Sequence, residues 1–310
     1  MAPENAPTEK IDYRQYLNPR VLAKIGALDI RARLIVEGFI SGMHRSPYKG
    51  FSIEFAQHRP YTSGDDIKFI DWKVFGRTDR HYIKQYEEET NLQVMLVVDA
   101  SASMGYGSAR NPPWRKYDHA ISIAASLSYA ALQQRDSAGL AVYDSRIRRI
   151  IRPSNNPRQW RIMIEELSAT VGEQKTDTGI VLEQIAEEIK HRSLVILVSD
   201  LFDDPERLIK GVRHLRYRRH DLICLQVLDH DELDFPFNQT TMFKGMEEAA
   251  ELVVEPQALR EAYLKELAEH NDRIRDACHQ LRVDCVQIDT SVPLDVSLPN
   301  FLASRAARMG

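Results

Sequence analysis

The fold is decided by two apolar stretches, QVMLVVDASAS at residues 93–103 and SLVILVSD at residues 193–200. Each contains five successive apolar residues without a polar interruption. A continuous apolar run is typical of a strand that is covered on both faces of a sheet. Both runs end in an aspartate, Asp99 in the first and Asp200 in the second. The sequence therefore predicts two buried strands that each carry a carboxylate to the same end of a parallel sheet.

Strands and helices alternate around these two stretches. Apolar residues recur at helical spacing in the ranges 116–133, 157–167, 179–190, 205–217 and 256–280. Further strands are expected at 138–143, 146–151, 221–228, 251–254 and 283–288, of which the second is an antiparallel return. Strands that alternate with helices pair in parallel through right-handed crossovers. The predicted fold class is α/β, a Rossmann-like open and mostly parallel sheet with helices on both faces.

The chain ahead of this region has a different composition. Residues 1–18 are dominated by Pro, Glu, Asn and Thr and are predicted to form a flexible tail. Residues 19–90 are predicted to form an N-terminal extension, a helix up to about residue 42 followed by short β-rich units. Residues 91–310 are assigned to the α/β domain.

Composition disfavours several classes of function. The 310 residues include 41 basic and 45 acidic side chains, and the net charge of −4 provides no basic field for nucleic acid. No apolar stretch approaches the roughly 18–20 residues of a membrane span, and the polar N-terminus does not resemble a secretory signal. The three cysteines (Cys224, Cys278 and Cys285) are too few for a disulfide framework and lack zinc-site spacing. We expect a cytoplasmic protein with no membrane span and no nucleic-acid partner.

Oxygen-bearing side chains gather at the predicted ends of the two buried strands. Ligands of open α/β sheets bind beyond the carboxyl ends of the strands, where the strand order reverses. Asp99 and Asp200 are expected there side by side, and their like charges favour a cation between them. Ser101 and Ser103 follow Asp99 at alternate positions, and Thr176 precedes a predicted helix. Such oxygens suit Mg²⁺, Mn²⁺ or Ca²⁺, and neutral hydroxyls leave the ion enough charge to bind one more carboxylate from outside.

In order and context, Asp99-x-Ser101-x-Ser103, Thr176 and Asp200 resemble the metal-ion-dependent adhesion site of von Willebrand factor A-type (vWA) domains. The resemblance implies that the two serines and the threonine contact the metal directly or through water. It also implies that the aspartates act mostly through water. An acidic residue of a partner protein then completes the coordination.

Two details of this match stay open. Thr178 is an alternative to Thr176 as the hydroxyl ligand. Asp200 is followed by Leu201, where many A-type domains have glycine, and then by the acidic pair 203–204. These acids add negative charge beside the predicted site.

The upstream segment 59–89, RPYTSGDDIKFIDWKVFGRTDRHYIKQYEEE, looks like the signature of a bacterial family whose domain has no known function (number fifty-eight). In that family such a segment precedes the A-type domain. Members are commonly encoded beside MoxR-type AAA+ ATPases, which implies joint work in chaperone-like maturation of other proteins. This chain has no G-x-x-x-x-G-K-[ST] loop, so any ATP chemistry is expected from such a partner.

The strongest enzymatic alternative is a haloacid-dehalogenase-like phosphohydrolase that uses Asp99 as its nucleophile. That chemistry requires a second carboxylate two residues later to protonate the leaving group, and Ser101 occupies this position. A dinucleotide site is disfavoured because Gly105-Tyr106-Gly107 lacks the third glycine of the motif. We therefore predict a metal-dependent protein-interaction module rather than an enzyme.

Overall fold

The computed structural model describes residues 53–62, 70–88, 92–108, 115–168, 176–239, 241–244, 246, 251–294, 296–298 and 300–301. These residues fall into two compact units, a smaller one within residues 34–91 and a larger one from Leu92 onward, and each is described by itself. The predicted tail at 1–18 and the predicted helix from residue 19 to about residue 42 lie outside the described residues.

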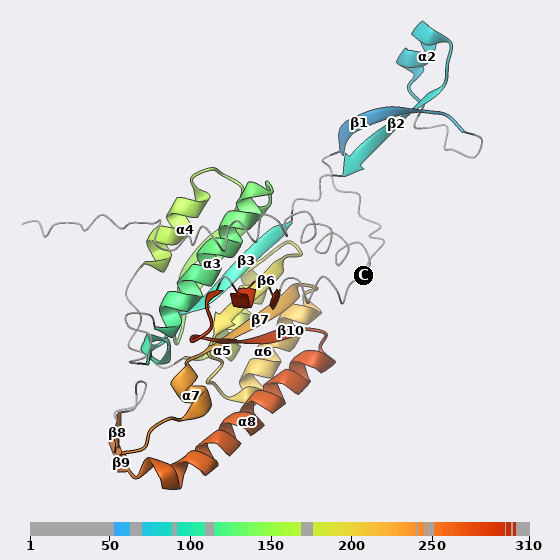
Figure 1. Cartoon of the computed structure of the whole chain (residues 1–310). Helices are drawn as coiled ribbons and strands as arrows, with labels where there is room; N and C mark the ends of the chain where they lie inside the picture. Colours follow the sequence, from blue (N-terminus) through green and yellow to red (C-terminus); the bar gives the residue numbers. More distant parts are fainter. Residues whose placement is uncertain are drawn as a thin grey trace, which may run out of the picture. The chain divides into compact units, whose positions relative to one another are not determined.

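A six-stranded sheet of order β10-β7-β6-β3-β4-β5 forms the centre of the larger unit (Figure 1). Its strands are β3 (Gln93–Asp99), β4 (Ser137–Tyr143), β5 (Ile147–Ser154), β6 (Leu194–Ser199), β7 (Asp221–Leu228) and β10 (Asp284–Asp289). Neighbouring strands are parallel except for the antiparallel pair β4–β5. The order reverses between β3 and β6, so the carboxyl ends of these two strands flank the place where such folds bind ligands. The predicted α/β class is confirmed.

Helices cover both faces of this sheet (Figure 1). The helices on one face are α3 (Lys116–Gln133) and α4 (Gln159–Leu167); those on the other are α5 (Thr178–Glu188), α6 (Pro205–Tyr217) and α8 (Pro256–Gln280). Along β3, Leu96 and Val98 pack in the core between the sheet and helices α3 and α4. Met95 and Val97 pack in the core on the other face, against α5, α6 and α8. Because both faces of the strand are buried, its apolar run has no polar alternation.

Helices α5 and α6 approach each other very closely at two glycines. A Cβ atom added to Gly179 would lie 2.5 Å from the backbone oxygen of Arg207, and one added to Gly211 would lie 2.7 Å from the oxygen of Gly179. Side chains do not tolerate contacts this short, so the crossing requires glycine at both positions. The tight packing fixes the start of α5 and the residues just before it, which include Thr176.

The chain between β7 and α8 leaves the sheet and returns to it. Its elements are α7 (His230–Asp234), β8 (Thr241–Lys244) and β9 (Glu251–Val254). Strands β8 and β9 pair in antiparallel register, which confirms the short strand predicted at 251–254. The rings of Phe235, Phe237, Phe243 and Tyr263 lie 4.9 to 5.5 Å apart and join this excursion to α8.

The smaller unit combines a strand pair with a short helix. Its elements are β1 (Ile53–Pro60), α2 (Trp72–Thr78) and β2 (Tyr82–Glu88), and the two strands pair in antiparallel register. The β-rich character predicted here is present, but the segment 72–78 is helical. Asp71 caps the helix because its Oδ1 accepts hydrogen bonds from the N–H groups of Lys73 at 2.9 Å and Val74 at 3.2 Å.

Candidate functional site

The candidate site lies at the carboxyl ends of β3 and β6. These strands pair in parallel with Val98 opposite Val198, so the aspartates that follow reach the same edge of the sheet. Asp99 and Asp200 are both fully buried. A short 3₁₀ helix, η3 (Ala102–Gly105), follows β3 at this edge.

Hydrogen bonds from Ser101 and Ser199 hold the carboxylate of Asp99. The backbone N–H of Ser101 donates to its Oδ1 at 2.8 Å, and the hydroxyl of Ser199 donates to its Oδ2 at 2.6 Å. Burial, together with the nearby negative charge of Asp200, raises the pKa of Asp99 to about 7. A cation beside this carboxylate would favour its ionised form and lower that pKa again.

Two hydroxyls converge just beyond Asp99. Ser101 is the N-cap residue of η3 and has an extended backbone conformation, and its Oγ lies 3.1 Å from the Oγ of Ser103. The side chain of Ser101 is buried and that of Ser103 is partly exposed. The alternate spacing in the sequence therefore places both hydroxyls on one side of the turn, as predicted.

A second pair of hydroxyls comes from the start of α5. The Oγ1 atoms of Thr176 and Thr178 lie 3.3 Å apart, and both threonines are buried. Thr178 also bonds the hydroxyl of Tyr143 at 3.2 Å, while its N–H donates to Asp203 Oδ2 at 2.7 Å. These contacts engage Thr178 in the packing of α5. Thr176 is therefore the better candidate of the two for a hydroxyl that binds a ligand.

Asp200 lies in a buried charge cluster. Its Oδ2 accepts a hydrogen bond from the ammonium of Lys116 at 2.8 Å, and the same ammonium donates to Glu232 Oε1 at 2.6 Å. Its Oδ1 accepts from the N–H of Phe202 at 3.1 Å. The amide of Gln226 donates to the Asp200 backbone oxygen at 3.2 Å. Both carboxylate oxygens of Asp200 therefore already have protein donors.

The residue after Asp200 has a left-handed backbone conformation although it is not glycine. Leu201 has a φ of 60°, in the left-handed region where glycine is favoured, and its side chain is fully buried. Its N–H donates to Ser199 Oγ at 2.9 Å, and its oxygen lies 2.9 Å from His270 Nε2. These contacts hold the leucine in a conformation that glycine adopts without strain.

The two acids beyond Leu201 have structural partners. Asp203 accepts the N–H of Thr178, and Asp204 caps α6 by accepting the N–H of Glu206 at 2.8 Å. Both acids are therefore engaged by backbone N–H groups and are not arranged like the paired acids that bind the metal ion of a phosphohydrolase. With Ser101 in the place of the required general acid, no observation favours the phosphohydrolase alternative.

The donor set fits a hard divalent cation of the Mg²⁺ type. Hydroxyls of Ser101, Ser103 and Thr176 and carboxylates of Asp99 and Asp200 are the oxygen ligands that such ions prefer. Among the described residues, no group of three or more His, Cys, Asp or Glu side chains is placed to hold a metal. An ion at this edge would therefore depend on the hydroxyls.

Sequence reasoning missed Lys116 and Glu232. Lys116 precedes Ala120, Ile123 and Leu127 at spacings of four, seven and eleven residues, which places it on the apolar side of α3. That spacing was a usable signal for a buried lysine. Glu232 lies in a polar helix of five residues, HDELD, that has no comparable pattern.

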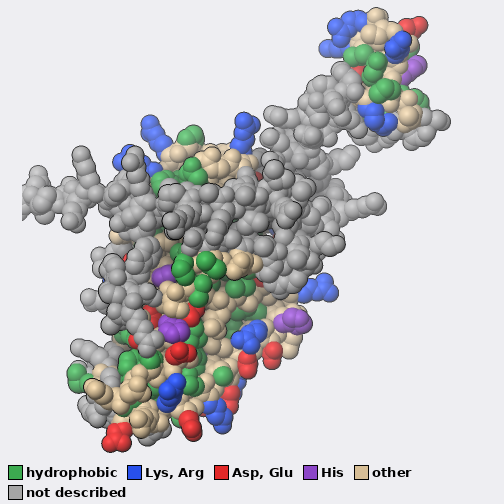
Figure 2. All heavy atoms as spheres, in the orientation of Figure 1, with side chains coloured by type: hydrophobic (Ala, Val, Ile, Leu, Met, Phe, Trp, Pro, Cys, Tyr) green, Lys and Arg blue, Asp and Glu red, His purple; other side chains and the backbone are tan. Residues whose placement is uncertain are grey.

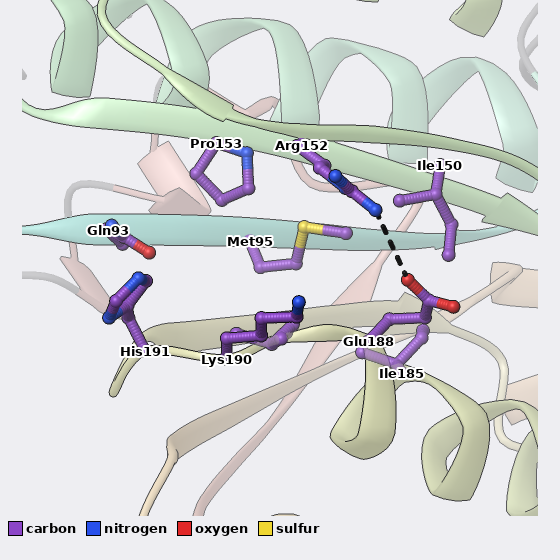
Figure 3. Close-up of a pocket in the computed structure, with 10 residues that line it drawn as sticks. Gln93, Met95, Ile150, Arg152, Pro153, Ile185, Glu188, Lys190 and His191 are labelled. Carbon is purple, nitrogen blue, oxygen red and sulfur yellow. Dashed lines mark ion pairs between the residues drawn. The ribbon is translucent and has the colours of Figure 1, made fainter.

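A separate cavity of about 240 Å³ opens at the other end of the sheet (Figure 3). It is lined by Gln93, Met95, Ile150, Arg152, Pro153, Ile185, Glu188, Ile189, Lys190 and His191. Arg152 and Glu188 form an ion pair of 4.0 Å across it. Gln93 begins β3 and Asp99 ends it, so the cavity is separated from the candidate site by the length of the strand.

Charges on the surface of the larger unit are mixed in sign. On the face shown in Figure 2, basic and acidic side chains alternate along α8 and do not form a field of one sign. Near the end of α6, Arg216 bonds Asp221 at 2.9 Å and His214 bonds Glu187 at 3.0 Å. These basic residues therefore stabilise the fold locally.

Comparison with known proteins assigns the family. Residues 57–273 match the family described as protein of unknown function DUF58. The chain belongs to this family. Curated relatives include uncharacterized proteins of Mycobacterium tuberculosis (Rv1480) and Mycobacterium bovis (Mb1516). Each is 22% identical over 294 residues, which cover 93% of this chain and 90% of the relative.

Solved structures that match this DUF58 protein share little sequence with it. BatB from Bacteroides thetaiotaomicron is 14% identical with a TM-score of 0.46, over 70% of this chain and 98% of that one. The SpRpn10 VWA domain is 13% identical with a TM-score of 0.38, over 68% and 95% of the two chains. An aerotolerance-related membrane protein from Bacteroides fragilis is 15% identical with a TM-score of 0.45, over 70% and 99%. Within the described part of the present chain, no helix has the length and hydropathy to span a membrane.

Proposed function

We propose that this DUF58 protein is a divalent-metal-dependent protein-interaction module. Ser101, Ser103 and Thr176 bind one cation, Mg²⁺ or in its place Mn²⁺ or Ca²⁺. Asp99 and Asp200 hold water molecules of the ion and balance its charge. An acidic residue of a partner protein fills the remaining coordination position.

The observation that supports this proposal most is the meeting of hydroxyls and carboxylates at one edge of the sheet. Three chain segments contribute: the turn after β3, the residues after the adjacent strand β6, and the residues just before α5. The two serine hydroxyls lie 3.1 Å apart, close enough to share one ion. Hydroxyl ligands do not neutralise a divalent charge, so the bound ion retains affinity for an external carboxylate.

The groups around the ligands keep them oriented. Ser199 and the Ser101 N–H hold Asp99, and the α5–α6 packing at Gly179 holds the residues around Thr176. When bound, the metal supplies a positive charge that attracts the partner's carboxylate. The protein contributes the fixed geometry, and no group of the chain is assigned a catalytic step.

We further propose a MoxR-type AAA+ ATPase as the partner, in chaperone-like maturation of other proteins in the cytoplasm. The support is the family membership of residues 57–273 together with the resemblance of segment 59–89. A direct test is co-purification with the MoxR-type ATPase of the same genome, in Mg²⁺ and in chelator. Retention that is equal in both conditions would contradict metal-dependent binding.

The metal site is tested by calorimetric titration of the wild-type chain with Mg²⁺ and with Mn²⁺. We expect one saturable site, lost in Asp99→Ala and in the double variant Ser101→Ala, Ser103→Ala. Ser168→Ala is the matched control, because its hydroxyl bonds only the Ile164 oxygen at the end of α4 among the contacts described. A folded double variant that binds metal and ATPase like the wild type would refute the mechanism. The same preparations should release no phosphate from a generic phosphoester.

A further inference from the structure

A fully buried lysine lies beside the proposed metal site. Lys116 is the first residue of α3, and its side chain has no exposed surface. Its ammonium bonds Asp200 and Glu232 and lies 4.9 Å from the ring centre of Phe202. Burying an ammonium is unfavourable unless it is paired with negative charge. The position of Lys116 therefore depends on these carboxylates.

The carboxylates depend equally on the lysine. Asp99 and Asp200 are fully buried, and the side chain of Glu232 is only 15% exposed. The serines and threonines nearby are neutral, so among the described residues these three acids are balanced by the ammonium of Lys116 and by hydrogen bonds. Without a positive charge, adjacent buried carboxylates repel one another strongly. The cluster needs a cation, and the protein itself carries one.

Glu232 holds the ammonium together with Asp200. Its second oxygen, Oε2, accepts the N–H of Asp229 at 2.8 Å, so the carboxylate is tied to the start of α7. Asp229 is itself held by the hydroxyl of Thr290 at 2.9 Å. The ammonium is therefore fixed between two positioned carboxylates rather than carried by a mobile side chain.

We infer that Lys116 is a built-in cation that holds the carboxylate cluster together without metal and weakens the affinity of the site for divalent ions. A metal ion and the ammonium both draw on the Asp200 carboxylate, and their like charges repel. Added negative charge offsets this repulsion, and the partner's carboxylate supplies it. Metal and acidic partner then bind cooperatively, since each raises the affinity for the other. The inference rests on the proposed metal site and extends it.

The decisive variant is Lys116→Met, which keeps an unbranched side chain of similar length and removes its charge. We expect Mn²⁺ to bind this variant at least tenfold more tightly than the wild type in calorimetry. We also expect a lower melting temperature in chelator and recovery of stability with Mn²⁺. Lys210→Met is the control, because Lys210 is 77% exposed and pairs with Glu183 on α5; it should match the wild type. Equal Mn²⁺ affinity in the wild type and Lys116→Met overturns the inference.

Glu232→Gln tests the same idea in a protein that keeps the ammonium, and it decides the matter if Lys116→Met does not fold. Removing one carboxylate leaves Lys116 to neutralise Asp200 alone. We expect Mn²⁺ affinity to fall at least tenfold relative to the wild type. Unchanged or increased affinity in folded Glu232→Gln contradicts the inference.

The outcomes separate this inference from the proposed function. Tight Mn²⁺ binding by Lys116→Met with none by the wild type supports the built-in cation and refutes a resident metal in the wild type. Equal binding by both supports the metal site and refutes the role of Lys116. Absence of binding in both folded proteins refutes both.

Discussion

Helix α5 joins two ends of the sheet that differ in how their charges are solvated. At its first residues, Gly179 has no room for a Cβ atom, and the nearby Lys116–Asp200 pair has no exposed surface. At its last residue, Glu188 borders a cavity of about 240 Å³ and pairs with Arg152, their side chains 54% and 83% exposed. Water screens the second pair and not the first. The charges of an ion pair are therefore strongly coupled only where the protein has excluded water from them.

The largest expected effect is on the buried pair. Asp200→Asn leaves the fully buried ammonium of Lys116 with one charged partner, Glu232. Removing one member of a buried ion pair costs about 3 kcal/mol. We expect that loss in the free energy of unfolding, measured by urea denaturation in chelator. A loss below about 1 kcal/mol would show that the cluster behaves like a surface pair.

The packing at the start of α5 should be almost as sensitive. In Gly179→Ala the new methyl group would contact Arg207 backbone atoms at 2.5 to 2.7 Å. Overpacking of this kind costs about 2 kcal/mol, and displacement of Thr176 should weaken metal binding. Thermal unfolding and Mn²⁺ calorimetry measure the two effects. Gly76→Ala is the control, since no atom lies within 4 Å of the added Cβ and the position is helical. Wild-type stability in Gly179→Ala would contradict the described contact.

The raised pKa of Asp99 predicts that the stability of the protein depends on pH. Its pKa is raised from 3.8 to about 7 by burial and by the charge of Asp200, so folding favours its protonated form. That contribution to stability is present at low pH and is lost as the pH rises from about 4 to about 7. In chelator, Asp99→Asn should therefore gain about 2 kcal/mol of stability over the wild type between about pH 5 and about pH 8.

Urea denaturation across this pH range provides the measurement for Asp99. Saturating Mg²⁺ should reduce the difference, because a cation stabilises the wild-type carboxylate and not the asparagine. Parallel stability curves for the two proteins in chelator would contradict a raised pKa at Asp99.

The smallest effect is expected at the exposed end. Glu188→Gln should change the free energy of unfolding by less than about 0.5 kcal/mol, since exposed pairs contribute little. Addition of salt should leave the difference between this variant and the wild type near zero. A loss above about 1 kcal/mol would mean that the cavity end also holds strongly coupled charges.

The fold and the gathering of oxygen-bearing side chains at one edge of the sheet were predictable because they depend on local sequence. Apolar runs marked β3 and β6, and the aspartate after each run marked the edge where the strands meet. The position of Lys116 was predictable in principle from its apolar helical side. Its partner Glu232 was not, because that contact joins residues 116 positions apart and leaves no periodic pattern in the sequence.

In the smaller unit, by contrast, the prediction from sequence gave too little weight to a local signal for a helix. Aromatic and β-branched residues around 70–75 indicated a strand. Asp71 provides an N-cap for the N–H groups that follow, and this capping accompanies a helix at 72–78. Residues 63–69, which belong to the same predicted β-rich extension, lie outside the described residues.

The Lys116 cluster also bears on the kinetics of folding. Its two ion pairs join residues 84 and 116 positions apart, so they form only after distant parts of the chain have come together. Contacts of such long sequence separation are expected to form late, when the central strands have already paired. Interactions absent from the transition state slow unfolding without speeding folding. The buried charges are therefore expected to set how long the assembled edge of the sheet persists once formed, and to have little influence on how fast it assembles.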